Sequence, residues 1–530
     1  MNRTRTNLLA LAHLAGAAVL LSTSVRAQGF DRSVRAAENR EPAIQRAEQD
    51  SAATKRLSEL RERTGARPNI VWVVVDDMGY GDPGCYGGGA VAGAATPNMD
   101  RLAADGLRLT SCYSQQTCTP TRSAILTGRL PVRTGLTRPI LAGDKVTRNP
   151  WADEVSLATL LSDAGYTTVL TGKWHIGEAE GMRPHDVGFD EFYGFYPAQK
   201  EISQRVDGRR YPELAVDPER RKDFEGLGIG HELVHGFKGG RTEQVSSIRS
   251  TEDMGRADQV LADFSVAKIK ELAESGQPFF LEHCFMKVHA DNFANPDLAG
   301  MSASNYPYKD GIVEVDLHLG AIRAALEEAG VLENTFVFFT SDNGPQMDAW
   351  PDAGYTPFRG AKGTTFEGGV RVPGIAFWPG MIRGGRESDD LFDLLDLFGT
   401  ALTLAGVSDD ALPQDRYYDF VDQTSFLLED EGRSRREAVY FWWGAELMAC
   451  RMHQYKLHRK VVMPAAPHMY IDYAVIQEVG LGGWMFDLYL DPKEEMPVGH
   501  RLSPWLASVG AKLKAHGATL IKYPAKNIGL

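Results

Sequence analysis

The residues with the clearest capacity for chemistry lie at positions 118–129, which read CTPTRSAILTGR. Thr119 is suited to cap a helix, Pro120 to occupy its first helical position, and Gly128 to end it. Cys118 is therefore predicted at the N-terminus of a short helix, where backbone N–H groups and the helix dipole favour an anion. This setting makes Cys118 a candidate catalytic nucleophile.

Arg122 falls in the first turn of the same helix, where its guanidinium can hold the oxygen of a nucleophile or of a substrate. A Cys-x-Pro-x-Arg match arises by chance in about one chain of this size and composition in a hundred. For a lone cysteine, a buried structural role beside a surface arginine is the more common arrangement. The catalytic interpretation of Cys118 therefore depends on the other motifs of the chain.

Two β-branched apolar segments, residues 70–75 and 336–339, are each followed by clustered oxygen ligands. In open α/β sheets the functional site lies at the carboxyl ends of the strands. Three carboxylates and an amide oxygen with no His or Cys between them suit a hard divalent cation, Ca²⁺ or Mg²⁺. A single Asp-Asp pair usually caps a turn, but two such clusters favour a metal. The predicted ligands are Asp76, Asp77, Asp342 and Asn343.

Cationic groups follow short strands in two further places. Lys173 and His175 are two residues apart on an extended segment and therefore project to the same side. His289 follows the strand that begins near residue 279, and Lys362 lies in the glycine-rich loop 358–369. Each of these groups alone is more often a solvated surface residue. Surface or structural roles are predicted for the remaining prominent histidines, His231, His235, His318, His453 and His458.

The elements around these motifs alternate between strands and helices, which predicts an α/β domain on a mostly parallel sheet. After about residue 430, short strands with polar breaks predict a smaller C-terminal α+β subdomain that ends in a helix over residues 506–516. The predicted strands are 70–75, 167–170, 279–281, 336–339 and 374–378. The predicted helices begin after Thr96 and Ser156 and span residues 257–274, 311–329 and 391–404.

The N-terminus has the features of an export signal. Arg3 and Arg5 precede an apolar stretch over residues 8–21, and a small-residue cleavage site places the cut before Gln28. An uncleaved membrane anchor is the alternative. The predicted divisions are a signal peptide over residues 1–27, an N-terminal extension over 28–66, a catalytic domain over 67–430 and a C-terminal subdomain over 431–530. The protein is predicted to be exported, periplasmic or secreted, with no stable membrane anchor.

Composition narrows the classes of partner. The 530 residues carry a formal net charge of −13, which argues against a nucleic-acid partner. The five cysteines are too sparse to predict a disulfide framework. They are Cys85, Cys112, Cys118, Cys284 and Cys450.

As a set, the motifs resemble those of the type I sulfatases of the alkaline-phosphatase superfamily, from about residue 68 to the C-terminus. The resemblance implies an alkaline-phosphatase-like sandwich: a large mixed, mostly parallel central sheet flanked by helices, plus a C-terminal subdomain with a short antiparallel sheet. The matching segments are 76–82 (DDMGYGD), 96–103 (TPNMDRLA), 118–129, 172–175 (GKWH), 341–344 (SDNG), Lys362 with 367–369 (EGG), and 486–495 (FDLYLDPKEE).

The resemblance also implies what becomes of Cys118. In this family the motif cysteine is oxidised by a separate maturation enzyme to Cα-formylglycine, whose hydrate is a geminal diol. One diol oxygen attacks the sulfur of a sulfated small molecule or sugar and forms a covalent sulfate ester. The second hydroxyl then helps to expel sulfate. The sulfur atom of Cys118 would therefore be lost before catalysis begins.

By the same resemblance, the four oxygen ligands would hold Ca²⁺, and Asp342 would be the base for the attacking hydroxyl. Arg122 and Lys173 would stabilise the diol oxygens, and His175 would take the second proton. His289 and Lys362 would bind sulfate oxygens, with His289 as the acid for the leaving oxygen. Two positions depart from the family pattern: Thr121 stands where Ser is common, and Ala290-Asp291 follows His289 where a proline is frequent.

Two other functions fit the same motifs. A formylglycine-dependent phosphodiesterase or phosphonate monoester hydrolase would share the tetrahedral oxyanion geometry. A non-catalytic metal-binding protein could retain the fold without the activity. Residues 178–255 are the least familiar stretch and are predicted to shape the leaving-group pocket. An aryl sulfate is the first expectation for the substrate, with sulfated sugars and alkyl sulfates as alternatives.

Overall fold

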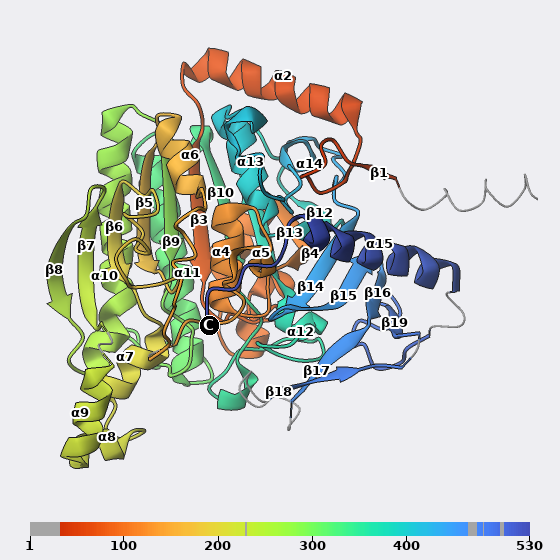
Figure 1. Ribbon diagram of the computed structural model, residues 1–530. Helices are drawn as coiled ribbons and strands as arrows, with labels where there is room; N and C mark the ends of the chain where they lie inside the picture. The colour runs from red at the N-terminus through yellow and green to blue at the C-terminus, as the bar shows by residue number, and fades with distance from the viewer. Residues whose placement is uncertain (1–31, 142, 228–229, 465–473, 481, 499–502) are drawn as a thin grey trace, which may run out of the picture.

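A computed structural model describes residues 32–141, 143–227, 230–464, 474–480, 482–498 and 503–530 (Figure 1). The predicted signal peptide lies outside this part of the chain. Within it, no helix is both long enough and apolar enough to cross a membrane. The largest element is an eleven-stranded sheet in the order β12-β4-β11-β10-β3-β9-β5-β6-β7-β8, with β13 paired to β4. Its strands are β3 (Asn69–Val75), β4 (Leu107–Tyr113), β5 (Thr167–Lys173), β6 (Glu191–Phe195), β7 (Glu232–Phe237), β8 (Arg241–Ser247), β9 (Phe279–Cys284), β10 (Thr335–Ser341), β11 (Arg371–Phe377), β12 (Arg386–Ser388) and β13 (Phe392–Asp393).

The centre of this sheet is parallel. Strands β10, β3, β9, β5 and β6 run in one direction, whereas β7, β8 and β11 are antiparallel to their neighbours on this path. Every residue of β3, β9 and β10 is buried, because both faces of the sheet are covered. Because these strands are parallel, their carboxyl ends lie at the same edge of the sheet. The acidic residues come directly after the strands at this edge.

Helices cover the two faces of the sheet (Figure 1). Val71 and Val73 of β3 pack in a core with residues of α3, α10 and α11, and Trp72 packs on the opposite face with residues of α4, α6 and α13. Alternate residues of β3 thus pack in the two cores on opposite faces of the sheet. These helices are α3 (Pro97–Ala104), α10 (Thr251–Ser275), α11 (Pro307–Glu328), α4 (Cys118–Thr127), α6 (Leu157–Asp163) and α13 (Asp396–Ala405). Shorter helices are α5 (Pro131–Thr134), α12 (Glu367–Val370) and α14 (Thr424–Leu428).

The C-terminal part forms a second, antiparallel sheet, drawn in blue in Figure 1. Buried charge joins it to the main sheet: Glu367 accepts from Lys456 Nζ at 2.9 Å and from the Tyr113 hydroxyl at 2.7 Å. The pairing is strong enough to lower the pKa of Glu367 to about 2 although burial opposes this shift. The elements are β14 (Ala438–Trp443), β15 (Glu446–Met452), β16 (Tyr455–His458) and β19 (Trp484–Asp487), the hairpin β17 (Lys460–Pro464) with β18 (Ala474–Glu478), and α15 (Ser503–Lys522).

Together these two sheets and their helices form the fold that the resemblance implies: a mixed, mostly parallel central sheet with a C-terminal antiparallel sheet. One predicted helix begins in the wrong place. Residues 391–404 were expected to be helical throughout, but Phe392 and Asp393 form β13 beside β4. Helix α13 begins only at Asp396, whose carboxylate accepts the Asp393 N–H at 3.2 Å. The apolar spacing does not reveal this short strand.

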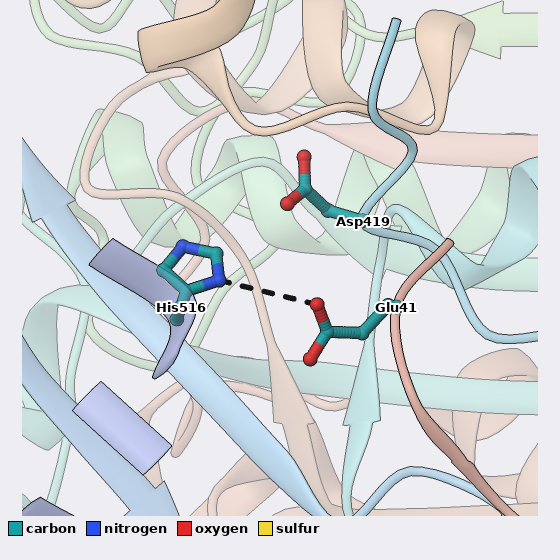
Figure 2. A group of neighbouring side chains, drawn as sticks. All are labelled: Glu41, Asp419 and His516. Atoms are coloured by element: carbon teal, nitrogen blue, oxygen red, sulfur yellow. Dashed lines mark ion pairs between the residues drawn. The ribbon is translucent and has the colours of Figure 1, made fainter. Parts of the chain in front are cut away.

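Residues 32–66, the described part of the predicted N-terminal extension, contain β1 (Ser33–Val34), β2 (Ala43–Ile44) and α2 (Ala47–Thr64). Helix α2 crosses the top of the view in Figure 1. The loop that connects β1 to β2 places Glu41 beside Asp419 and His516 (Figure 2). These three residues have the composition of a metal site, but their contacts are structural. Trp442 Nε1–H donates to His516 Nε2 at 3.2 Å, so the lone pair of that nitrogen is already engaged, and Nδ1 faces Glu41 Oε2 at 3.9 Å.

Asp419 is also committed, because both of its oxygens accept from Arg133 Nε, at 2.7 and 3.0 Å. A cation here would have to displace these donors. The cluster instead joins three distant segments of the chain.

A third group of helices, α7 (Gln199–Val206), α8 (Pro212–Val216) and α9 (Pro218–Gly226), lies in the chain between β6 and β7. Helices α8 and α9 project from the lower left of the molecule in Figure 1. Short 3₁₀ turns complete the described structure: η1 (Gly84–Tyr86), η2 (Gly89–Ala92), η3 (Leu332–Asn334), η4 (Met347–Ala349) and η5 (Asp409–Ala411).

The central sheet buries one carboxyl group that should make stability depend on pH. Glu282 on β9 is 1% exposed, and its Oε2 has no hydrogen-bond partner among the described residues. Burial raises its pKa from 4.5 to about 7. Between these two pH values the folded protein keeps a proton that the unfolded chain has lost, so stability falls as pH rises through this window, by up to about 3 kcal/mol.

Glu282→Gln should remove this dependence. We expect the free energy of unfolding of the variant, measured in denaturant at pH 5 and pH 8, to fall less with pH than that of the native protein. Glu243→Gln, a matched change on the exposed strand β8, should leave the native dependence intact. Equal pH dependence in the native protein and Glu282→Gln would contradict the assignment.

Candidate active site

Cys118 is the first residue of α4, and its position corrects one prediction. The residue at the N-cap position is Thr117, with extended backbone (φ −154°, ψ 170°), whereas Thr119 was expected to be the cap. Pro120 is therefore the third helical residue, which is tolerated because the N–H groups of the first turn have no partner within the helix. Thr121 Oγ1 donates back to the Thr117 carbonyl at 3.1 Å. Cys118 is thus closer to the helix dipole than predicted.

The acidic residues follow two neighbouring strands of the sheet. Asp76 and Asp77 come directly after β3, and Asp342 and Asn343 directly after β10. The two strands pair in parallel to their last residues. The Asp77 backbone N–H consequently donates to Asp342 Oδ1 at 3.2 Å. All four side chains are at most 1% exposed.

Each buried carboxylate has its own cation. Three negative and three positive charges therefore balance at buried positions, which offsets part of the cost of burying them. The pairs are Lys173 Nζ with Asp76 Oδ2 at 2.5 Å, Lys362 Nζ with Asp77 Oδ1 at 2.7 Å, and Arg122 with Asp342 Oδ2 at 2.8 Å (Nη2) and 3.0 Å (Nε).

Two oxygens of the cluster have no partner among the described residues. They are Asp76 Oδ1 and Asn343 Oδ1, both buried. Ligand atoms of Asp76, Asp342 and Cys118 lie within 4.8 Å of one another. Burial raises the pKa of Asp77 and of Asp342 in spite of their cations. Unpartnered oxygens and incompletely compensated carboxylates fit a divalent cation with oxygen ligands.

His175 faces Cys118. Its Nε2 lies 3.0 Å from the Ile140 carbonyl, which can only accept, so the ring proton is on Nε2. The unprotonated Nδ1 lies 3.1 Å from Cys118 Sγ. Burial, with the charges of Lys173 and Arg122, holds the pKa of His175 well below its ordinary value. His175 is therefore a neutral ring with a lone pair directed at residue 118.

His289 presents its other nitrogen to the site. Its Nδ1 is hydrogen-bonded to the Ala290 carbonyl, which places the ring proton there. Its Nε2 lies 3.7 Å from Asp77 Oδ2. Burial, with the charges of Lys362 and Lys173, lowers the pKa of His289 well below its ordinary value.

A cavity of about 310 Å³ opens directly above these groups. Cys118 and both histidines form part of its lining. Much of the remaining wall comes from residues 198–227, inside the stretch that the sequence marked as the least familiar. The other lining residues are Leu141, Ala198, Lys200, Glu201, Gln204, Phe224, Leu227 and Gln346.

The structure brings all ten predicted site residues into one connected cluster, each at most 4% exposed. Their roles remain predictions. The other prominent histidines lie elsewhere: His235, for example, pairs with Glu191 at 2.7 Å, and His458 with Glu494 at 2.6 Å. Sequence reasoning located the cavity wall only as a segment. Its individual members, such as Lys200, carry no local motif.

Buried cations and oxygen ligands for a metal, gathered around one residue that faces a cavity, can stabilise the charge that develops when an ester of a tetrahedral oxyanion is cleaved. The chain belongs to the sulfatase family, whose model matches residues 68–407. It is accordingly a sulfuric ester hydrolase.

Similar proteins support this assignment. N-acetylgalactosamine-6-sulfatase of Canis lupus familiaris is 36% identical over 405 residues, which cover 74% of this chain and 71% of the relative. Arylsulfatase A of Bos taurus is 36% identical over 401 residues, 74% of each chain. The crystal structure of the PsFucS1 sulfatase from Pseudoalteromonas sp. is 49% identical, with a TM-score of 0.91, and covers 94% of this chain and 99% of that chain.

The phosphonate monoester hydrolase of Agrobacterium radiobacter is a distant structural neighbour. It is 19% identical, with a TM-score of 0.51, over 86% of this chain and 96% of that chain. This similarity shows a shared fold and no more.

The two unpartnered oxygens generate a prediction about metal binding. Because a ligand that binds only the folded state stabilises it by mass action, a saturating divalent cation should raise the thermal midpoint. We expect Asp76→Asn to weaken binding of Ca²⁺, measured by calorimetry, at least about tenfold. Asp348→Asn, the same change at an exposed position near Asn343, should bind as the native protein does. Equal affinity in both variants would contradict the ligand assignment.

Proposed function

We propose that the protein hydrolyses sulfate monoesters through a formylglycine made from Cys118, as its relatives' family does. The observation that carries this proposal is the position of Cys118 Sγ, 3.1 Å from His175 Nδ1 and beside the oxygens of Asp76 and Asp342. Burial raises the pKa of the Cys118 thiol although Lys173 and Lys362 oppose the shift. The thiol is therefore a poor source of thiolate, which favours an oxygen nucleophile at this position.

In the proposed reaction, a maturation enzyme converts the Cys118 thiol to an aldehyde, and water adds to give the diol. One diol hydroxyl transfers its proton to Asp342 and bonds to sulfur as the ester oxygen departs. Arg122 holds Asp342 Oδ2 by two hydrogen bonds and also donates to the Lys173 carbonyl at 3.1 Å. The base thus has a fixed orientation relative to residue 118.

Lys173 and Lys362 are fully buried cations on either side of the two aspartates. Ca²⁺, held by the four predicted ligands, would polarise the sulfate group and add two positive charges to a balanced cluster. An anionic sulfate ester would then enter a site with excess positive charge. Arg122, Lys173 and Lys362 are the cations that would meet its oxygens.

The two histidines divide the proton transfers. His175 presents a lone pair to residue 118 and would take the proton of the second hydroxyl while sulfate leaves and the aldehyde re-forms. His289 presents an unprotonated Nε2 to the cavity side of Asp77. This nitrogen would take up a proton from solvent when the anionic ester binds and would then give that proton to the leaving oxygen. The two rings present different nitrogens to different places, Nδ1 of His175 to residue 118 and Nε2 of His289 to the cavity, which supports separate roles.

For the substrate, we propose a sulfated sugar with the scissile sulfate at Cys118 and the ring in the cavity. Leu141, Phe224 and Leu227 supply apolar surface for a ring face, and Lys200, Gln204 and Gln346 supply hydrogen-bonding groups for hydroxyls. The names of the relatives with 36 to 49% identity include a sugar sulfatase and an arylsulfatase. Aryl sulfates with activated leaving groups would then serve as simpler substrates.

We also propose that the protein is exported across a membrane and that residues 1–27 are a cleaved signal peptide. The proposed boundaries of the catalytic domain lie at residues 66 and 430. An exported sulfatase would meet extracellular sulfated material. The maturation enzyme would act before the site closes, because Cys118 is only 1% exposed in the folded protein.

Mass spectrometry of the peptide that contains Cys118, from protein made in its native host, should show loss of the sulfur atom. Cys118→Ala should reduce sulfate ester hydrolysis at least about ten-thousandfold, while the Ca²⁺-induced rise in thermal midpoint persists. An unmodified thiol in fully active protein would overturn the formylglycine proposal. Parallel assays with sulfate and phosphate esters of the same phenol should favour the sulfate.

Lys200→Met should test the sugar-binding assignment. We expect its KM for a sugar sulfate to rise about tenfold, because one charge-assisted hydrogen bond contributes roughly 1.5 kcal/mol. Its kcat should change little, since Lys200 does not contact the reacting atoms. Lys222→Met on the exposed surface of α9 is the matched control. An unchanged KM in Lys200→Met would show that this side chain does not contribute to binding of the sugar.

A further inference from the structure

One buried amide joins the cavity wall to the loop that carries His289. Gln199, the first residue of α7, is 3% exposed. Its Nε2 donates to the His289 carbonyl at 2.7 Å and to the Asp291 carbonyl at 2.5 Å. The two bonds hold the backbone on both sides of Ala290. The Ala290 carbonyl between them is the partner of His289 Nδ1.

The Asp291 side chain fastens the same loop a second time. Its Oδ2 accepts from Ser203 Oγ of α7 at 3.0 Å and from the Tyr211 hydroxyl at 2.7 Å. Its Oδ1 is paired with the Arg210 guanidinium. Arg210 and Tyr211 immediately precede α8. The carboxylate is thus held by three donors from the segment that forms the cavity wall.

Helix α7 therefore has two faces with different tasks. One face supplies Lys200 and Gln204 to the cavity. The other, through Gln199 and Ser203, holds the His289 loop. A rigid helix that both lines the cavity and holds the loop of His289 fixes the distance between that loop and a leaving group bound in the cavity. Asp291 takes this role in the stretch after His289, where the resemblance to the family leads one to expect a nearby proline.

We propose that Gln199 and Asp291 are positioning residues that orient His289 for protonation of the leaving oxygen. This inference rests on the proposed function, in which His289 is the acid. Neither residue touches the reacting atoms. If their role is to aim the acid, their loss should harm poor leaving groups most, whereas a purely structural role would affect all substrates equally.

Phenyl sulfate and 4-nitrophenyl sulfate provide a matched pair of probes. They place similar rings in the cavity, but the nitro group makes the departing phenolate far less dependent on a proton. The assay uses the matured, Ca²⁺-loaded enzyme and measures kcat and KM for both. In Gln199→Ala we expect kcat to fall about 30-fold for phenyl sulfate and about threefold or less for 4-nitrophenyl sulfate, with little change in KM.

Asp291→Asn keeps the shape of the side chain but weakens its bond to Arg210, and it should show the same selectivity to a smaller degree. It also keeps the proposal testable if Gln199→Ala does not fold. Gln277→Ala and Asp348→Asn make the same chemical changes at exposed positions and should match the native enzyme. Thermal midpoints with and without Ca²⁺ verify that each variant folds and binds the metal.

His289→Ala separates the two levels of the argument. Selective loss of phenyl sulfate turnover in His289→Ala and in Gln199→Ala supports both the acid and its positioning. If His289→Ala loses phenyl sulfate turnover selectively but Gln199→Ala does not, the positioning role is overturned and the acid assignment stands. This holds whether Gln199→Ala keeps its activity or loses it equally for both substrates. No selectivity in any variant overturns the acid assignment together with the positioning role.

Discussion

Asp76, Asp77 and Asp342 are carboxylates buried at the ends of two neighbouring strands, and the rest of the site follows from that constraint. An uncompensated buried charge would cost several kcal/mol, so each carboxylate needs a cation within contact distance. Lys173, Lys362 and Arg122 meet this need but not completely, because the pKa of Asp77 and of Asp342 remains raised by burial. The folded cluster therefore still favours the binding of a further cation, as a preorganised metal site does.

Each of these cations comes from a different element, so several strands and helices must be held together to form the site. Lys173 ends β5, Arg122 lies in α4, and Lys362 lies in the loop before α12. The parallel order β10-β3-β9-β5 brings the strand ends into one row, and the cores on both faces hold that row rigid. A residue such as Trp72 contributes to catalysis only in this sense. It fixes the strand whose last residue precedes Asp76.

The strands and their acidic ends were predictable because their signals are local. A fully apolar β-branched run such as Asn69–Val75 fits only a strand covered on both faces, and the acidic residues after it follow in sequence. The cap of α4 was misplaced by two residues because Thr117 and Thr119 are equally suited by type, and only the tertiary fold decides between them. The bonds from Gln199 to the loop of His289 span about 90 residues of sequence and leave no periodic trace.

Backbone carbonyls determine which ring nitrogen each of the two histidines presents to the site. His175 donates its Nε2–H to the Ile140 carbonyl and presents the lone pair of Nδ1 to residue 118. His289 donates its Nδ1–H to the Ala290 carbonyl and presents Nε2 to the cavity. Both rings are kept neutral by burial and neighbouring cations. The residue type alone does not determine which nitrogen faces the site. That depends on which carbonyl a loop presents, so the loops that hold Ile140 and Ala290 are as much a part of the site as the rings themselves.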